Sequence, residues 1–446
     1  MKMFIQLPEK VKFIIDTITA AGYEAYAVGG CIRDSILGRE PNDWDITTSA
    51  RPQQVKALFR RTVDTGIAHG TVTVLLEREG FEVTTYRIDG EYEDHRHPKE
   101  VVFTSQLVED LRRRDFTINA MAYNETVGLV DAFDGMGDIR RGMIRCVGCA
   151  RERFTEDALR ILRAIRFSAQ LGYTIEKETQ RAIRELAPSL EAISAERIQT
   201  ELVKLLVSPH PDYLRQAYDM GVTKVILPEL DSCMETPQNH PHHCYSVGEH
   251  ILHSLQSVPA VKDMRLAMLL HDIGKPRTLE VDAEGISHFH GHPAVSAEMA
   301  VEILRQLRFD NDTIVTVRRL VEFHDYGNNV EPTPVIVRRA VNRIGEDIFE
   351  KFLMVKRADI LAQSNYRRQE KLDLVDAWET QYREITAQKQ CVSLKCLAVT
   401  GKDLIAAGMK PGPQLGEMLQ QMLDHVLEVP EDNTRERLFN IFMKIT

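Results

Sequence analysis

The sequence predicts an α+β fold, in which a head of strands and short helices precedes a much longer all-helical region. Two observations support this prediction. Segments rich in β-branched and aromatic residues, bounded by turn residues, occur within about the first 145 residues. From Thr155 onward, apolar residues recur with the spacing of amphipathic helices. A chain of 446 residues exceeds one ordinary core, so two to four domains are expected.

The head is expected to begin with a helix and to continue as short strands. Apolar residues at helical spacing predict the helix from about Glu9 to Ala20. The segments with strand composition are Ala25–Val28, Trp44–Thr48, Thr71–Glu77 and Phe81–Arg87. These segments predict a small sheet.

The region after the head is expected to be helical almost throughout. TEDALRILRAIRF predicts one amphipathic helix with Thr155 as its N-cap. Further helices are predicted at Lys177–Leu186, Ala195–Leu206 and Pro211–Met220. The His-rich stretch NHPHHCYSVGEH opens a helical region that runs to about residue 370, and Pro411-Gly412-Pro413 precedes a tail helix.

Composition excludes several classes of protein. Hydrophobic residues make up 43% and charged residues 27%, as in an ordinary soluble protein, and no stretch is apolar enough for a membrane span. The N-terminus carries Pro8, Glu9 and Lys10 where a signal peptide needs an apolar run, so a cytoplasmic protein without a membrane partner is expected. The seven cysteines are irregularly spaced, and the single CxxC pair, Cys146 and Cys149, is interpreted as core thiols.

The net charge of −10 does not exclude an RNA-binding protein, because the basic residues are locally dense. The dense groups are Arg112 to Arg114, Arg140 with Arg141, and the arginines at 151, 153, 160, 163 and 166. A local basic track can contact phosphates although the whole chain is acidic.

Asp43 and Asp45 are the first candidate chemical groups. They lie two apart on a predicted strand, so their side chains are expected on one face. Two carboxylates so close repel each other unless cations lie between them, and Mg²⁺ takes carboxylate and phosphate oxygens. The pair therefore predicts a site for two Mg²⁺ ions, which would activate a hydroxyl and stabilise a phosphate leaving group.

A glycine pair precedes these aspartates. Gly29 and Gly30 lie between a predicted strand and a short helix, where bare backbone can approach phosphates, and Arg33 follows one helical turn later. The order GG, then RD, then DWD is far more specific than any of the three alone.

This combination resembles the signature of the class II tRNA nucleotidyltransferase and bacterial poly(A) polymerase family, in the polymerase-β superfamily. Four further stretches resemble family motifs, in order: RRRDFTINAMAY (112–123), DAFDGMGDI (131–139), TEDALRILRAIRF (155–167) and SAERIQTELVKLL (194–206), the last with Arg197 and Glu201. DAFDGMGDI resembles the third of the family's five motifs, which is thought to couple head to neck. The resemblance extends over essentially the whole chain.

The resemblance implies a polymerase-β-like head with a small mixed sheet at 1–147, followed by all-α parts: a neck at 148–235, an HD-like body at 236–370 and a tail at 371–446 that contacts tRNA. It implies addition of C, C and A to the tRNA 3′ end from CTP and ATP, by a monomer or homodimer. Asp43 and Asp45 would be catalytic and hold Mg²⁺. The implied nucleotide-binding residues are Gly29, Gly30, Arg33, Arg114, Asp115, Asn119, Asp157, Arg160, Arg163 and Arg166.

Within the family's nucleotide-selection motif, which begins at Glu156, Asp157 and Arg160 are three apart and are predicted to share a helix face. A carboxylate accepts from an exocyclic amine, and a guanidinium donates to a ring nitrogen. Cytosine and adenine both offer that donor beside an acceptor, whereas uracil and guanine reverse the order. The protein itself would then act as the template.

Two alternatives to full CCA addition stay open. The segment at 86–98 resembles a loop of family members that add A, which favours CCA addition over CC addition alone. It does not separate a CCA enzyme from an A-only enzyme or a poly(A) polymerase. Asp110 is a weaker candidate for an accessory carboxylate.

A second set of residues resembles the HD-domain metal-dependent phosphohydrolases. The implied ligands of Mn, Fe, Ni or Zn are His250, His271, Asp272, His292, His324 and Asp359. His288 and His290 compete with His292, which is preferred because it directly precedes a predicted helix. The histidines at 240, 242 and 243 are expected to be surface or capping residues.

The HD-like part has three possible roles. It could be a phosphatase or 2′,3′-cyclic phosphodiesterase, or it could keep only the fold. In a third reading the whole chain is a regulatory phosphohydrolase whose head senses nucleotides. Paired metal carboxylates at Asp43 and Asp45 argue against a mere sensor.

Overall fold

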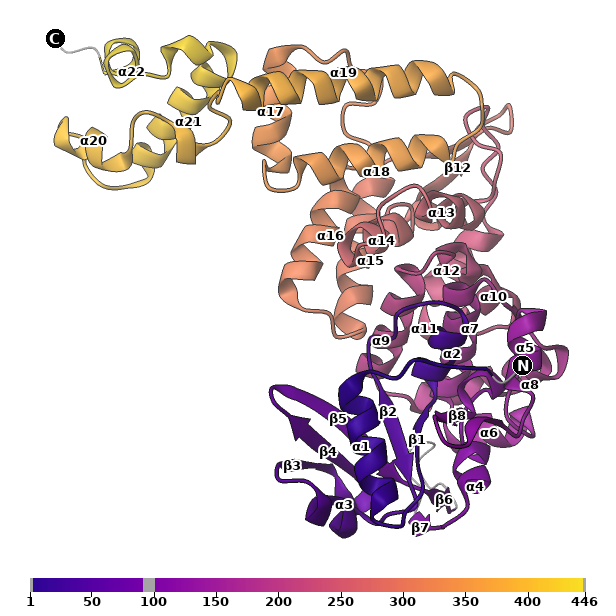
Figure 1. The fold of residues 1–446 in the computed structure, drawn as a ribbon. Helices are drawn as coiled ribbons and strands as arrows, with labels where there is room; N and C mark the ends of the chain where they lie inside the picture. The colour runs from indigo at the N-terminus through magenta and orange to yellow at the C-terminus, as the bar shows by residue number, and fades with distance from the viewer. Residues whose placement is uncertain (1–2, 91–100, 444–446) are drawn as a thin grey trace. The chain divides into compact units, whose positions relative to one another are not determined.

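The computed structural model describes residues 3–90 and 101–443, which form two compact units. The first unit spans Met1–Pro228 and the second Glu229–Thr446. Figure 1 shows strands gathered in the first unit and helices throughout the second. The sequence-predicted α+β architecture is confirmed.

The first unit contains a seven-stranded mixed sheet with the order β3-β4-β5-β2-β1-β8-β9. Its strands are β1 (Ala25–Val28), β2 (Asp45–Thr48), β3 (Thr62–Gly66), β4 (Thr71–Leu76), β5 (Glu79–Thr85), β8 (Met121–Asn124) and β9 (Gly128–Asp131). β2 pairs with β5 in parallel, and the other neighbours in the sheet are antiparallel. The four predicted strands all belong to this sheet, with ends shifted by at most two residues.

The two faces of the sheet bury different side chains. Ala27, Ile46 and Val83 pack in one apolar core with α1 (Glu9–Ala20), which has the predicted bounds, and α3 (Pro52–Leu58). Figure 1 shows α1 lying along this sheet. Because side chains alternate along a strand, Asp45 and Thr47 lie on the opposite face from Ile46. That opposite face is where α4 (Leu107–Arg112) packs.

The segment TEDALRILRAIRF is not one helix, so this prediction is wrong. It is divided between α6 (Ala150–Glu156) and α7 (Leu159–Leu171). Thr155 is inside α6, where its hydroxyl donates to the Arg151 carbonyl at 2.8 Å. It is therefore not the N-cap of α6 or α7. Asp157 lies between the helices in an extended conformation, and its carboxylate accepts from the Leu159 amide at 3.1 Å. Aspartate side chains compete with helices in this way, because they bond a backbone N–H two residues on.

The rest of the neck follows the predictions more closely. α8 (Lys177–Leu186) and α9 (Ala195–Leu206) have the predicted bounds. The helix predicted at 211–220 is instead a 3₁₀ turn at Pro211–Tyr213 followed by α10 (Leu214–Asp219), and α11 (Thr223–Ile226) completes the neck. Connecting elements are α2 (Gly30–Ile36), α5 (Gly135–Arg141) and the parallel pair β10 (Met143–Ile144) and β11 (Thr174–Ile175).

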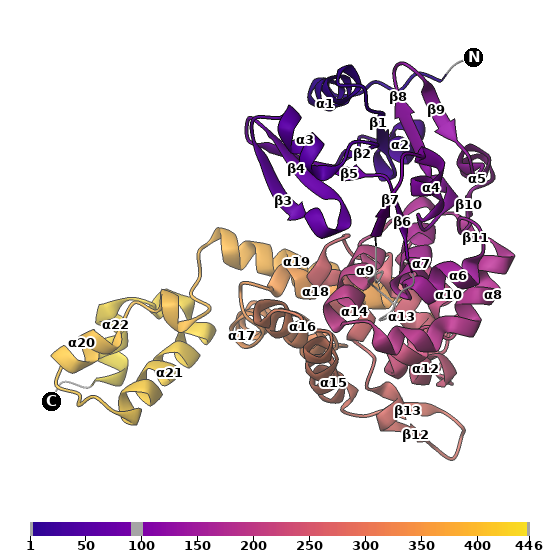
Figure 2. The same cartoon turned by 90° about the horizontal axis from the view of Figure 1, so that it is seen from below.

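The second unit is helical, with one exception. Its helices are α12 (Pro228–Glu235), α13 (Val247–Leu255), α14 (Lys262–Leu270), α15 (His292–Gln306), α16 (Asn311–Phe323), α17 (Pro334–Ile344), α18 (Phe349–Leu361), α19 (Arg368–Ala387), α20 (Gly401–Ala406), α21 (Pro413–Glu428) and α22 (Arg435–Phe442). The exception is the hairpin of β12 (Leu279–Val281) and β13 (Ser287–Phe289), which Figure 2 shows extending from the helices. The all-α prediction missed it, since each strand has three residues.

Much of the loop predicted at 86–98 lies outside the described residues. At the start of this segment, β6 (Arg87–Asp89) pairs antiparallel with β7 (Val101–Phe103), which follows the segment. Among the described residues, no helix is long and apolar enough to cross a membrane.

Candidate functional site

Five carboxylates line one cavity of the head: Glu9 and Glu79, and the three residues Asp43, Asp45 and Glu82. Asp45 begins β2, whereas Asp43 lies before the strand, so the prediction that both are strand residues is wrong. The register pairs Ile46 with Val83, which places Glu82 of β5 on the same face of the sheet as Asp45. Asp43, Asp45 and Glu82 all line the cavity. We call these three residues the carboxylate cluster.

Electrostatics in the carboxylate cluster favour a bound cation. Burial raises the pKa of Asp45, Asp43 raises it further, and Arg114 opposes both. Burial also raises the pKa of Glu82, with Asp45 and Asp43 adding to the effect. Such carboxylates resist holding negative charge side by side, and a divalent cation among their oxygens would relieve the repulsion. The donor set therefore fits a hard metal ion.

Arg114 reaches this region from the loop after α4. The Asp110 carboxylate is fully buried and lies 3.6 Å from an Arg114 nitrogen. Asp110 also accepts from the Thr47 hydroxyl at 3.0 Å. The buried Nε of Arg114 has no hydrogen-bond partner among the described residues. Arg113 Nε donates to the same carboxylate at 2.9 Å, so Asp110 pairs with two neighbouring arginines.

The backbone conformation at position 29 favours glycine. Its φ of 86° is in the left-handed region, and its amide donates to the Met121 carbonyl at 3.2 Å. A Cβ at this position would lie 3.0 Å from the Arg114 guanidinium. Gly30 begins α2 directly afterwards. Backbone amides and an arginine are therefore brought together beside the sheet.

A continuous polar chain joins α2 to the neck helix α7. Arg33 donates to both carboxylate oxygens of Asp34, at 2.9 and 2.8 Å, and to Asn119 Oδ1 at 2.7 Å. Asn119 donates to Asp115 Oδ1 at 3.1 Å, and Arg163 Nε donates to Asp115 Oδ2 at 2.8 Å. Burial opposes the charge of Asp115, but Arg163 and Asn119 outweigh burial and lower its pKa. The chain fixes the orientation of four predicted nucleotide-binding side chains.

Asp157 and Arg160 do not share a helix, so the prediction of a common helical face is wrong. Asp157 is held by Arg197 of α9, whose Nη2 lies 2.9 and 3.2 Å from its carboxylate oxygens. Arg160 in α7 donates to Glu156 Oε2 at 2.6 Å and to the Arg113 carbonyl at 3.0 Å. Tertiary contacts therefore position the two side chains.

Arg166 and Glu201 form a buried ion pair between α7 and α9. Arg166 Nε donates to Glu201 Oε2 at 2.6 Å, and the guanidinium stacks 3.6 Å from the Phe167 ring centroid. Both side chains are buried, so the structure assigns Arg166 a packing contact within the neck.

We expect Glu201→Ala to lower the free energy of unfolding of the first unit by about 3–5 kcal/mol, because it leaves the Arg166 charge buried and unpaired. The chain has two tryptophans, Trp44 in the first unit and Trp378 in the second. In a Trp378→Phe background, urea unfolding followed by Trp44 fluorescence measures the effect. Glu178→Ala removes an exposed neck ion pair and should cost less than about 1 kcal/mol. An equal loss of unfolding free energy in Glu201→Ala and Glu178→Ala would contradict the prediction.

The second unit holds a cluster of histidines and aspartates. The residues are His250, His271, Asp272, His292, His324 and Asp359, and we call them the His–Asp cluster. They form two groups with ligand atoms close enough to share an ion: His250, His271, Asp272 and Asp359 in one, and Asp272, His292 and His324 in the other.

Asp272 belongs to both groups because its two oxygens face different histidines. Oδ2 lies 3.3 Å from His271 Nε2 and 3.5 Å from His250 Nε2. Oδ1 lies 3.2 Å from His292 Nε2 and 3.5 Å from His324 Nε2. From residues 3–90 and 101–443 the buried oxygens accept no well-directed hydrogen bond, although Lys275 Nζ is 2.7 Å from Oδ2. A buried carboxylate so placed fits a ligand shared by two metal ions.

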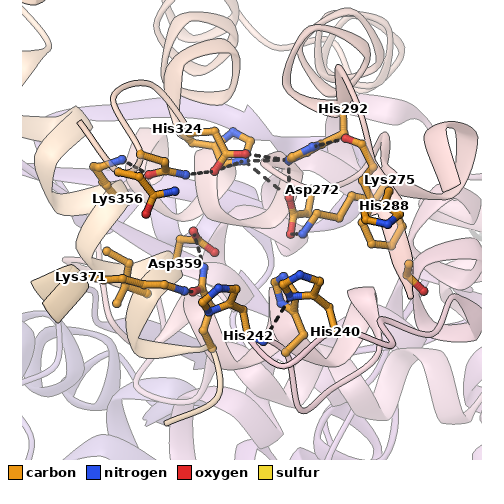
Figure 3. A pocket seen from close by; sticks show the side chains of 18 of the residues that line it. His240, His242, Asp272, Lys275, His288, His292, His324, Lys356, Asp359 and Lys371 are labelled. Carbon is orange, nitrogen blue, oxygen red and sulfur yellow. Dashed lines mark hydrogen bonds and ion pairs between the residues drawn. The ribbon is translucent and has the colours of Figure 1, made fainter. Parts of the chain in front are cut away.

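The His–Asp cluster opens into a cavity of about 300 Å³ that carries several lysines. Figure 3 shows Lys275 beside Asp272, with Lys356 and Lys371 on the side of Asp359. Burial lowers the pKa of Lys356 to about 8, and burial also lowers the pKa of Lys371. Ammonium groups beside a cluster of residues that could hold a metal ion suit an anionic ligand such as a phosphate.

The other histidines near the His–Asp cluster differ from one another in their contacts. His288 contacts Asp282 at 2.7 Å, whereas His292 is the histidine beside Asp272. His240, His242 and His243 are half-buried and line the cavity, and none of them belongs to the two groups whose atoms could share an ion. They follow α12 in a loop whose path the sequence does not reveal.

Family models match three parts of the chain. The poly A polymerase head domain matches residues 25–145, the probable RNA and SrmB-binding site of polymerase A matches residues 172–234, and the putative domain 2 of tRNA nucleotidyltransferase matches residues 278–442.

Two relatives align along nearly their whole length. The CCA-adding enzyme of Levilactobacillus brevis is 37% identical over 418 residues, covering 93% of this chain and 92% of that protein. The CCA-adding enzyme of Enterococcus faecalis is 36% identical over 433 residues, covering 97% and 94%. This chain belongs to the CCA-adding enzyme family. A match to the Lactiplantibacillus plantarum member is stronger, 54% over 209 residues, but spans only 51% of that protein.

Solved structures of the CCA-adding enzyme family share the fold. The Bacillus stearothermophilus enzyme in complex with CTP has a TM-score of 0.72 at 29% identity, with 98% of each chain covered. The Thermotoga maritima enzyme complexed with tRNA has a TM-score of 0.60 at 20% identity and covers 100% of each chain, which supports the fold alone. Family membership also makes the chain a nucleotidyltransferase, a class that generally uses divalent metals.

Sequence reasoning missed Glu82 and the role of Arg197. Glu82 carries only a weak local signal, since its place beside Asp45 depends on β2 and β5 being parallel neighbours. Arg197 was noted only as part of a motif, because its partner Asp157 lies forty residues earlier in the chain. An unexplained carboxylate at an alternating position of a strand was the one available hint for Glu82.

Proposed function

We propose that this chain adds C, C and A to the 3′ end of tRNA without a nucleic-acid template, from CTP and ATP, with release of pyrophosphate. The observation that carries the proposal is the carboxylate cluster of Asp43, Asp45 and Glu82 in one cavity of the head of a CCA-adding enzyme family member. A-only addition and poly(A) synthesis are not favoured, because the full-length relatives are CCA-adding enzymes.

Asp43, Asp45 and Glu82 would hold two Mg²⁺ ions. Bound there, the ions supply Lewis-acid stabilisation of the attacking 3′ hydroxyl and of the leaving pyrophosphate. The protein's own residues bind and orient the nucleotide: Gly29 and Gly30 bring bare backbone to the triphosphate, and Arg114 adds a donor whose Nε is still unpaired. Catalysis is then mainly a matter of positioning.

Base choice falls to Asp157 and Arg160. In our proposal the Asp157 carboxylate accepts from the exocyclic amine that cytosine and adenine share, and Arg160 donates to the adjacent ring nitrogen. Arg197 holds Asp157 in place through two short contacts. Uracil or guanine would place donor against donor and acceptor against acceptor, leaving buried groups unpaired. Asp157 and Arg160 need no common helix for this selection, since contacts with other residues orient them.

The direct test uses tRNA transcripts that end at the discriminator base, at C or at CC, incubated with labelled CTP or ATP. We expect CTP to extend the first two transcripts and ATP to extend the third by one residue. Failure to extend the discriminator-ended transcript would refute the proposal, and long A tails would favour a poly(A) polymerase instead.

We expect Arg197→Ala to weaken base discrimination more than overall activity. Without Arg197 the Asp157 carboxylate loses its orientation, so rejection of UTP relative to CTP should fall by about 10–100-fold, the equivalent of one or two hydrogen bonds. Single-turnover rates with each nucleotide measure this ratio. Arg181→Ala, an exposed arginine of α8, is the matched control and should leave the ratio unchanged. An equal fall in the single-turnover rate with every nucleotide would contradict the prediction.

The remaining parts complete this proposal. The tail at 371–446 contacts tRNA, the neck at 148–235 selects the nucleotide, and the protein acts in the cytoplasm as a monomer or homodimer. The bacterial full-length relatives support the location. Size-exclusion chromatography with light scattering measures the oligomeric state.

A second activity is proposed for the body at 236–370: hydrolysis of phosphomonoesters or 2′,3′-cyclic phosphates. The supporting observation is that four members of the His–Asp cluster, Asp272, His292, His324 and Asp359, line one cavity with three lysines. Imidazoles with carboxylates suit Mn, Ni, Fe or Zn, which would supply an activated water when bound. Incubation of protein loaded with each metal with p-nitrophenyl phosphate and 2′,3′-cyclic AMP tests the activity. Metal binding without turnover would show a body that keeps only the fold.

A further inference from the structure

Two cysteines of the second unit converge between α19 and α20. Cys391 and Cys396 both donate to one acceptor, the Ser393 carbonyl, at 3.3 and 3.2 Å. The two sulfurs are therefore neighbours, although five positions separate the residues and no short motif marks them.

The two thiols have opposite chemical environments. Cys396 is exposed, and its sulfur accepts from the backbone amides of Val392 and Ser393 at 3.2 and 3.3 Å. Burial opposes ionisation, but the hydrogen bonds from Ser393, Cys391 and the backbone outweigh it and lower the pKa of Cys396. Cys391 is buried, and burial raises its pKa to about 12. Cys396 is thus the exposed and more easily ionised thiol of the pair, and Cys391 is its buried, protonated neighbour.

We propose that Cys391 and Cys396 form a reversible disulfide in response to hydroperoxides. The Cys396 thiolate attacks a hydroperoxide, forming a sulfenic acid and releasing hydroxide or alkoxide. The Cys391 sulfur then attacks the sulfenic sulfur, its proton leaves with the hydroxyl group as water, and the S–S bond forms. Two thiols are oxidised and one hydroperoxide is reduced. A dithiol reductant reverses the reaction.

The pair sits where its state affects the tail. Leu397 and Val399, directly after Cys396, are buried in the core that α20, α21 and α22 share. The Asn433 amide donates to the Cys396 carbonyl at 3.0 Å and accepts from the Ala398 amide at 2.8 Å. Disulfide formation removes the thiol hydrogen bonds to Ser393, so oxidation would alter how this segment anchors the tail.

The CxxC pair gives a contrast within the same chain. Cys146 is buried and its pKa is raised, chiefly by burial. Cys149 is exposed, as is Cys244, and neither is hydrogen-bonded to another cysteine among the described residues. Cys149 and Cys244 therefore serve as internal controls for an exposed thiol without a resolving partner.

The first test measures thiol reactivity in the full-length protein. Brief alkylation with iodoacetamide at neutral pH, followed by peptide mass spectrometry, should modify Cys396 several-fold faster than Cys149 and Cys244, because more of it is thiolate. A rate for Cys396 equal to or below both controls would overturn the proposal.

The second test follows the bond itself. Hydrogen peroxide should remove two hydrogen atoms from the protein mass and give a Cys391–Cys396 cross-linked peptide that dithiothreitol reverses. Cys391→Ser should instead leave a sulfenic acid on Cys396, trapped by dimedone, and Cys396→Ser should leave Cys391 unoxidised. The control Cys149→Ser should behave like the parent. Absence of the cross-linked peptide in the parent, or its loss in Cys149→Ser, would refute the assignment.

Discussion

Replacing Asp45 by Asn is expected to lower the rate of nucleotide transfer by about 10³-fold or more. The substitution removes a negative charge from the carboxylate cluster and leaves its shape nearly unchanged. Metal stabilisation of the transition state is worth several kilocalories per mole, and each 1.36 kcal/mol is about tenfold in rate. Single-turnover extension of a tRNA ending in CC with labelled ATP measures the loss.

The control for this prediction is Asp64→Asn, which neutralises a head aspartate of β3 that pairs with Lys56 outside the cavity. Its transfer rate should remain within about twofold of the parent, as expected for an exposed ion pair. Asp45→Asn should keep the parent's thermal unfolding temperature and its tRNA affinity in a filter-binding assay. If Asp45→Asn retained more than a tenth of the parent rate, the carboxylate cluster would not be the catalytic centre.

The sequence predicted well those features that depend on neighbouring residues. α1, α8 and α9 have the predicted bounds because their apolar stripes repeat every three to four residues over at least ten positions. The order of chemical motifs was equally visible, since each motif is a short run. The family was also predicted correctly, because five ordered motifs are specific.

Features set by tertiary contacts were not predictable. The break at Asp157 combines a local bond, from the Leu159 amide to its carboxylate, with a tertiary ion pair to Arg197 that no neighbouring residue announces. Glu82 joins Asp45 only through the parallel pairing of two strands. His243 illustrates the same limit: its burial, which lowers its pKa to about 3, comes from a loop folding over the His–Asp cluster. Single-sequence patterns carry no signal for such contacts.

Asp272→Asn is expected to abolish metal binding in the second unit at both positions of the His–Asp cluster. Each Asp272 oxygen faces a different pair of histidines, so one neutral amide weakens both groups. Loss of a shared ligand should cost at least about 100-fold in affinity, because loss of a merely supporting residue already costs about 10–100-fold. Metal content measured by plasma mass spectrometry, after dialysis against each metal, tests this expectation.

The design separates ligand loss from misfolding. Asp272→Asn also leaves the buried Lys275 without its carboxylate partner. Lys275→Met is the matched control, because it breaks the same ion pair by removing the lysine and keeps every predicted ligand. His250→Ala removes a member of only one group and should leave the other ion bound. Transfer of A to tRNA, a head activity, should persist in all three variants. If Asp272→Asn and His250→Ala lose the same amount of metal, Asp272 serves one ion and the shared-ligand assignment fails.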